Sequence, residues 1–199
     1  MEQILTVAVG FVLTTVIGGW WASRLQQRSW ERQNELRLRE NERSRAEDAS
    51  RELSALLDRR LYRMLRVYWA IAGYDGTESA ETGLTDCLAE YRAVLYEWND
   101  RLNTNLALVS SHFGDETRSM LEAAYEDFRR VGGDLERAAG QVRQGRDAST
   151  LLDGLGPQFE GWEPGSLNNR VYRLCLAMMT QLRDGRVGRG SAAPWPDHE

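Results

Sequence analysis

The sequence predicts an all-α protein in which a single N-terminal transmembrane helix continues into a helical stalk and is followed by an up-and-down helical bundle. Three observations predict this fold class. An uncharged apolar run near the N-terminus is long enough to span a bilayer, apolar residues recur with helical spacing in four later segments, and no segment alternates as a strand would. The expected parts are a short outer N-terminus (1–3), the transmembrane helix (4–22), a charged helical stalk (23–52), a bundle domain (53–184) and a disordered tail (185–199).

The transmembrane helix is predicted from the segment Ile4–Ala22, which contains no charged residue. Nineteen helical residues reach about 28 Å, which is close to the hydrocarbon thickness of a bilayer. A cleaved signal peptide and a buried helix of a globular core are the alternatives. A signal peptide is disfavoured because only Met1, Glu2 and Gln3 precede the apolar run, and no small-x-small cleavage site follows it.

The flanks of this segment predict its orientation. The membrane-interface residues are expected to be two tryptophans that close the apolar run and three arginines that follow it: Trp20, Trp21, Arg24, Arg28 and Arg32. Basic residues flank only the C-terminal side, so the N-terminus should lie outside and the C-terminal domain in the cytoplasm. Every basic residue is Arg, which indicates GC-rich coding and hence a bacterial cytoplasmic (inner) membrane.

Small residues recur at every fourth position of the predicted transmembrane helix and form one stripe: Thr6, Gly10, Thr14, Gly18 and Ala22. Such a stripe lets two helix backbones approach closely and favours a homo-oligomer. The alternative is that these residues only reflect the high frequency of small side chains in membrane helices.

The stalk and the first bundle helix are expected to be continuous, since no Gly or Pro occurs between Ser23 and Ala72. The stalk is polar nearly all round, which makes it a poor coiled coil. Apolar residues at helical spacing begin with Leu53 and continue to Trp69, and the stretch Gly73–Gly76 should end the helix.

Three further helices are predicted. The second starts between Thr77 and Thr85 and carries a seam with steps of four and three: Leu84, Leu88, Tyr91, Leu95, Trp98, Leu102, Asn105 and Val109. Gly114 should end it, and a third helix should run from about Glu116, with a kink or break at Gly132-Gly133. Residues 145–166 should form an ordered loop with at most one short helix, and Ser166 should cap the last helix.

No motif for catalysis, a cofactor or a metal is found in the sequence. Phosphate-loop and dinucleotide-binding glycine patterns are absent, and so is lysine. The two histidines, His112 and His198, lie far apart, and no Glu-x-x-His pair occurs. Cys87 and Cys175 have neither C-x-x-C nor ligand spacing, so reduced and buried thiols are expected.

A polar pocket within the bundle is an alternative site. It would be lined by Trp98, Asn103, Asn105 and His112, with Arg170 as a further lining residue beside Asn103, and would belong to a membrane-tethered ligand sensor or enzyme. The simpler interpretation is that these residues form part of the core, its rim and a helix end.

The expected partners are the lipid bilayer and an unidentified protein. The net charge is −5, and four Glu residues interleave the seven Arg between Arg24 and Arg45, so nucleic-acid binding is disfavoured while contact with anionic lipid is favoured. The function expected from the sequence is therefore that of a membrane-anchored interaction or scaffold protein without a catalytic site.

Overall fold

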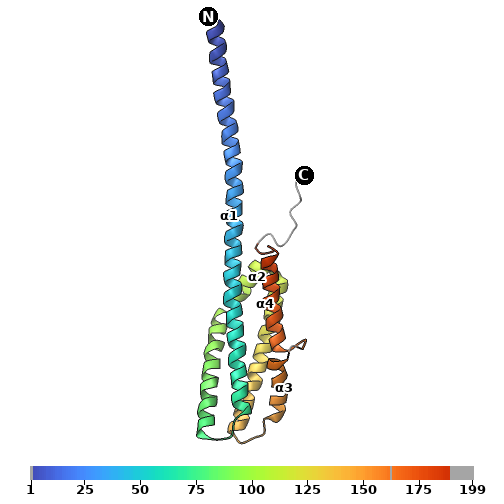
Figure 1. Ribbon diagram of the computed structural model, residues 1–199. Helices are drawn as coiled ribbons and strands as arrows, with labels where there is room; N and C mark the ends of the chain where they lie inside the picture. Colours follow the sequence, from blue (N-terminus) through green and yellow to red (C-terminus); the bar gives the residue numbers. More distant parts are fainter. Residues whose placement is uncertain (1, 162, 189–199) are drawn as a thin grey trace. The chain divides into compact units, whose positions relative to one another are not determined.

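The computed structural model describes the backbone of residues 2–161 and 163–188, and the side chains of residues 24, 27, 30–161 and 163–188. These residues form four helices and no strand (Figure 1): α1 (Glu2–Ala72), α2 (Glu78–Arg143), α3 (Ser149–Glu160) and α4 (Leu167–Arg183). The prediction of an all-α fold is therefore confirmed. The chain comprises two units, Met1–Glu42 and Arg43–Glu199.

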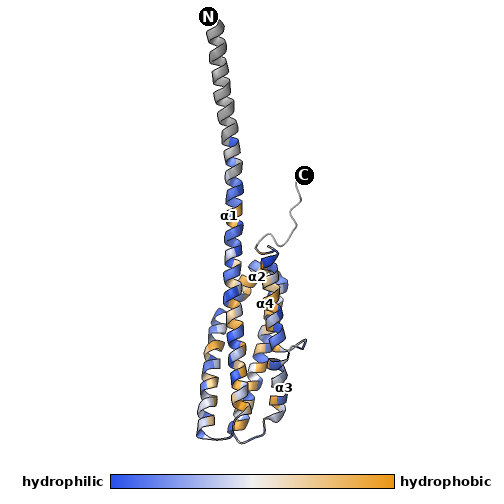
Figure 2. Ribbon diagram, viewed as in Figure 1, coloured by the Kyte–Doolittle hydropathy of each residue, from blue (hydrophilic) through white to orange (hydrophobic). Residues whose placement is uncertain are grey.

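The first unit contains the N-terminal part of α1. Its described side chains are mostly exposed and polar, as the blue colouring in Figure 2 shows, and Trp30 is 71 % exposed. Among the described residues, no helix combines the length and the apolar character that crossing a membrane requires. The side chains of Ile4–Ala22 lie outside the described residues, and so do the small-residue stripe, Trp20, Trp21 and Arg28. The transmembrane helix therefore stays a prediction.

The second unit begins with the C-terminal part of α1, which packs into a core from Ala46 onward. A short turn then reverses the chain, and Gly76 provides the positive φ of 79° that this turn requires. Thr77 caps α2 by accepting a hydrogen bond from the Ala80 amide. Ion pairs between Arg59 and Glu97 and between Arg63 and Glu90 fix an antiparallel register of the two helices.

α2 consists of two helical halves joined at Gly114, which has φ 80° and ψ 174°. These dihedral angles are essentially restricted to glycine, so the predicted break at Gly114 is confirmed. The second half folds back along the first, as ion pairs from Arg92 to Glu136 and from Glu81 to Arg143 show.

The predicted kink at Gly132-Gly133 was wrong, because the helix continues through both residues. Gly132 serves a close approach instead: a Cβ added there would lie 2.3 Å from the Tyr91 hydroxyl oxygen. Gly133 has open space around it and is tolerated within a helix that packing on both sides holds in place.

α1 and the two halves of α2 form three of the four positions in the bundle, and α3 and α4 together form the fourth. The predicted short helix within 145–166 is α3, and Tyr68 of α1 packs against its Phe159 with ring centroids 5.8 Å apart. Ser166 accepts a hydrogen bond from the Asn169 amide, so the predicted cap of the last helix is confirmed. α4 runs antiparallel to the second half of α2, because its Gln181 donates to Thr117 at 2.9 Å while Arg170, near the start of α4, pairs with Asp127.

The bundle core is built almost entirely of apolar side chains from all four helices. The heart of it is formed by the largest fully buried residues: Trp98, Arg60, Phe128, Leu57, Met64, Ile71, Leu84, Leu121, Leu135, Leu155, Leu167 and Leu174. Arg60 is the exception in this set. Cys87 is buried, Cys175 is half-buried, and both thiols are free.

Candidate functional site

The four residues of the predicted pocket differ in their burial in the described part of the chain. Trp98 is fully buried in the core, whereas Asn103 is exposed on the outside of α2. Asn105 is half-buried, with its side-chain nitrogen enclosed and without a hydrogen-bond partner. His112 lies two residues before the Gly114 kink, with its ring 6.3 Å from that of Phe113. Arg170 pairs with Asp127.

The most unusual group in the bundle is the guanidinium of Arg60, which the sequence analysis missed. The residue is 1 % exposed, and its charged carbon lies 4.6 Å from the centre of the Phe128 ring and 5.3 Å from that of Trp98. These are distances at which a cation is attracted by the negative face of an aromatic ring. The rings themselves pack together with centroids 6.2 Å apart.

No carboxylate pairs with Arg60 among the residues that the structure describes. Burial lowers the pKa of its guanidinium, and hydrogen bonding to the Tyr91 hydroxyl opposes this effect. Burial also raises the pKa of Tyr91, while the charge of Arg60 opposes that shift. Within the described residues, the Nε and Nη1 atoms of Arg60 and the Nε1 atom of Trp98 have no hydrogen-bond partner. The cluster is thus a buried cation held by aromatic faces and one phenol.

The close approach at Gly132 positions this cluster. Tyr91 reaches Arg60 with its hydroxyl only because Gly132, on the facing half of α2, has no side chain. A sequence signal for Arg60 existed: Leu53, Leu57, Arg60, Met64, Val67 and Ile71 follow one another in steps of four and three, and all are buried. An arginine at a seam position marks a buried charge.

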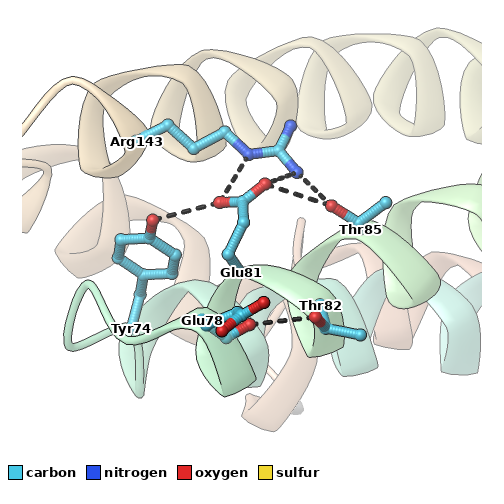
Figure 3. A network of polar contacts seen from close by, with 6 residues as sticks. All are labelled: Tyr74, Glu78, Glu81, Thr82, Thr85 and Arg143. Carbon is cyan, nitrogen blue, oxygen red and sulfur yellow. Dashed lines mark hydrogen bonds and ion pairs between the residues drawn. The ribbon is translucent and has the colours of Figure 1, made fainter.

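A polar network ties together the end of the bundle where α1 meets α2 (Figure 3). Glu81 accepts hydrogen bonds from Arg143 at 3.2 Å, from the Tyr74 hydroxyl at 3.0 Å and from Thr85 at 3.1 Å. Arg143 also donates to Thr85 at 2.7 Å. These contacts lower the pKa of Glu81, and the bond from Arg143 has the largest effect. The network joins the first and last turns of α2, which makes it a clamp rather than a site with an open substrate position.

A groove of about 650 Å³ lies at the opposite end, where α2 kinks beside the C-terminal half of α4. We call it the kink groove. Its lining combines apolar and charged side chains from both helices and from the turn after α4: Phe113, Gly114, Asp115, Glu116, Thr117, Met120, Arg173, Leu176, Ala177, Thr180, Gln181 and Arg186. The groove is open to solvent and is lined by both apolar and charged groups.

No group of three or more His, Cys, Asp or Glu side chains in the described residues is arranged to hold a metal ion. Comparison with known proteins adds no assignment, since no protein-family model, no curated protein and no solved structure matches this chain.

Proposed function

We propose that this chain is a single-pass membrane protein of the bacterial cytoplasmic membrane whose helical bundle docks a protein partner. The single observation that carries the proposal is the uncharged segment Ile4–Ala22, with two tryptophans and three arginines on its C-terminal side alone. The proposal includes the orientation, with the N-terminus outside and the bundle in the cytoplasm.

Two features of the described residues support this function. The backbone of α1 is helical without interruption from Glu2 to Ala72, so one helix contains both the apolar segment and the first helix of the bundle. The bundle also exposes large apolar side chains on several helices: Tyr62, Trp69, Tyr96, Tyr172, Leu176 and Met179. Exposed aromatic and aliphatic side chains of this kind are available for contact with a protein partner.

Cysteine labelling in intact bacterial cells tests the topology. One variant carries Gln3→Cys and another carries Ser191→Cys, both in a background in which Cys87 and Cys175 are replaced by Ala. A membrane-impermeant maleimide should label only the Gln3→Cys variant from outside, and both proteins should sediment with membranes. Labelling of Ser191→Cys from outside, or recovery of the chain in the soluble fraction, would overturn the proposal.

The small-residue stripe supports self-association as part of the same proposal. Replacing Gly10 and Gly18 with Leu should abolish crosslinking between copies in membranes, while Val9→Leu with Val16→Leu, on other faces of the helix, should leave crosslinking intact. Equal crosslinking of both double variants would show that this stripe does not mediate contact.

A further inference from the structure

The chain that follows α4 is directed onto the kink groove. Arg186 lines the groove, and Val187 packs against the bundle core. The Gly188 amide donates a hydrogen bond to the carbonyl oxygen of His112 at 3.1 Å, one residue before the groove residue Phe113. The last described residue is therefore fixed at the rim of the groove.

The sequence after Gly188 has the composition of a segment that fits this surface. Its eleven residues include an aromatic anchor between two prolines, Pro194-Trp195-Pro196, and two acidic residues, Asp197 and Glu199. Proline restricts the chain to extended conformations, so less conformational entropy is lost when such a segment binds.

The α4 side of the groove offers an apolar and a basic group, while the acidic lining residues Asp115 and Glu116 belong to α2. Leu176 lines it and is 49 % exposed, and Met179, one turn further along α4, is 60 % exposed. Arg173 lies one turn before Leu176, is exposed, and has no ion-pair partner among the described residues. A segment that runs back along α4 would pass Leu176 first and Arg173 second. Trp195 would then lie against Leu176, and Asp197 would lie beside Arg173.

The distances permit this arrangement. Seven residues from Gly188 to Trp195 span at most about 23 Å when extended. Gly188 is bonded to His112, whose neighbour Phe113 lines the same groove as Leu176 and Arg173, so an extended segment of this length is long enough to follow the groove to both residues.

We propose that residues 189–199 of this chain bind the kink groove intramolecularly, with Trp195 against Leu176 and the acidic residues beside Arg173. The groove is then an internally covered docking surface, and a partner that uses it must displace the chain's own segment. This inference goes beyond the proposed function and does not depend on the membrane anchor.

Fluorine NMR of the full chain labelled with 5-fluorotryptophan tests the proposal, with Trp195→Phe used to identify the Trp195 resonance. The resonance should be shifted from its position in a free peptide of residues 189–199. Leu176→Asp should return it to the peptide position, and Arg173→Glu should move it part of the way. Leu108→Asp, a matched change at an exposed leucine outside the groove, should leave it unchanged.

Trypsin cleavage after Arg189 provides a second measurement. Docking should slow this cleavage about tenfold relative to the Leu176→Asp variant, since cleavage requires the undocked population. A Trp195 resonance at the free-peptide position in the unmodified chain would overturn the proposal. So would a shift that Leu176→Asp leaves unchanged, or one that depends on protein concentration and thus reports binding to a second copy.

Discussion

At the scale of single residues, Arg60 is buried in an environment that disfavours its charge. A buried charge costs several kcal/mol in desolvation, and apolar replacements of similar volume are often neutral or stabilising. Cation–π contacts with Phe128 and Trp98 and the bond to Tyr91 offset part of this cost. No carboxylate among the described residues pairs with Arg60, so removing the guanidinium does not leave a carboxylate unpaired.

Arg60→Met is therefore expected to leave the free energy of unfolding unchanged or to raise it by up to about 3 kcal/mol. Arg60→Ala should lower it by about 2–5 kcal/mol, because the side chain's volume is lost from the core. Urea unfolding followed by circular dichroism measures both values. Arg59→Met, at the neighbouring half-exposed position, is the control. If Arg60→Met destabilised the bundle as much as Arg60→Ala, the charge itself would be essential to the fold.

Gly132 and Gly133 form a matched pair for testing the Tyr91 contact. Gly132→Ala should lower the free energy of unfolding by about 1–3 kcal/mol, because its Cβ would overlap the Tyr91 hydroxyl. Gly133→Ala should raise it by about 0.5–1 kcal/mol through helix propensity alone, since the space around that position is open. Adding Tyr91→Phe to Gly132→Ala should recover part of the loss. Equal effects of the two alanines would contradict the close approach.

At the scale of secondary-structure elements, the clamp at the α1–α2 turn predicts a pH dependence. The folded-state pKa of Glu81 lies below that of an unfolded glutamate. The resulting stabilisation is present above about pH 4.3 and is lost as the pH falls through the lowered pKa. Glu81→Gln should lower the thermal midpoint at neutral pH, and the difference from the unmodified chain should shrink in acid. Glu78→Gln is the control, because that side chain takes no part in the clamp (Figure 3). A Glu81→Gln effect that is constant from pH 7 to pH 3 would exclude this origin.

A second prediction at this scale concerns Gly114, where the two halves of α2 join. With φ 80° and ψ 174°, an alanine at this position should cost about 1–3 kcal/mol of unfolding free energy. Gly140→Ala, within the regular helix and with open space around it, should be neutral or stabilising. A harmless Gly114→Ala would mean that the joint adopts a different backbone conformation.

Helix caps and breaks could be predicted from the sequence, whereas contacts between distant residues could not. Thr77, Gly114 and Ser166 act through local backbone geometry, and their roles as cap or break could be predicted from residue type and position. The role of Gly132 could not be predicted in this way, because it depends on Tyr91. Tyr91 is distant in sequence and becomes a neighbour only when α2 folds back on itself. The candidate pocket residues differ in burial for a related reason: helical periodicity places Trp98 and Asn105 on one seam, whereas Asn103 is exposed on another face of the helix.

At the scale of the whole molecule, the packing of α1 into the bundle begins at Ala46 rather than at the predicted Leu53. Ala46 and Ser50 are small, so apolar periodicity does not reveal them, yet both are buried. The kink groove was equally beyond prediction, since it combines residues from α2, α4 and the turn that follows. The all-α character of the fold, by contrast, followed from helical periodicity and the absence of strand-like alternation.

Membrane anchoring through Ile4–Ala22 is the central claim, and alkaline carbonate extraction of bacterial membranes tests it most directly. The unmodified chain should remain in the pellet. A chain of the same length with Val9→Asp and Leu13→Asp should be extracted, because each central aspartate disfavours insertion by about 2.5–3.5 kcal/mol. Complete extraction of the unmodified chain, or retention of both chains alike, would contradict the account.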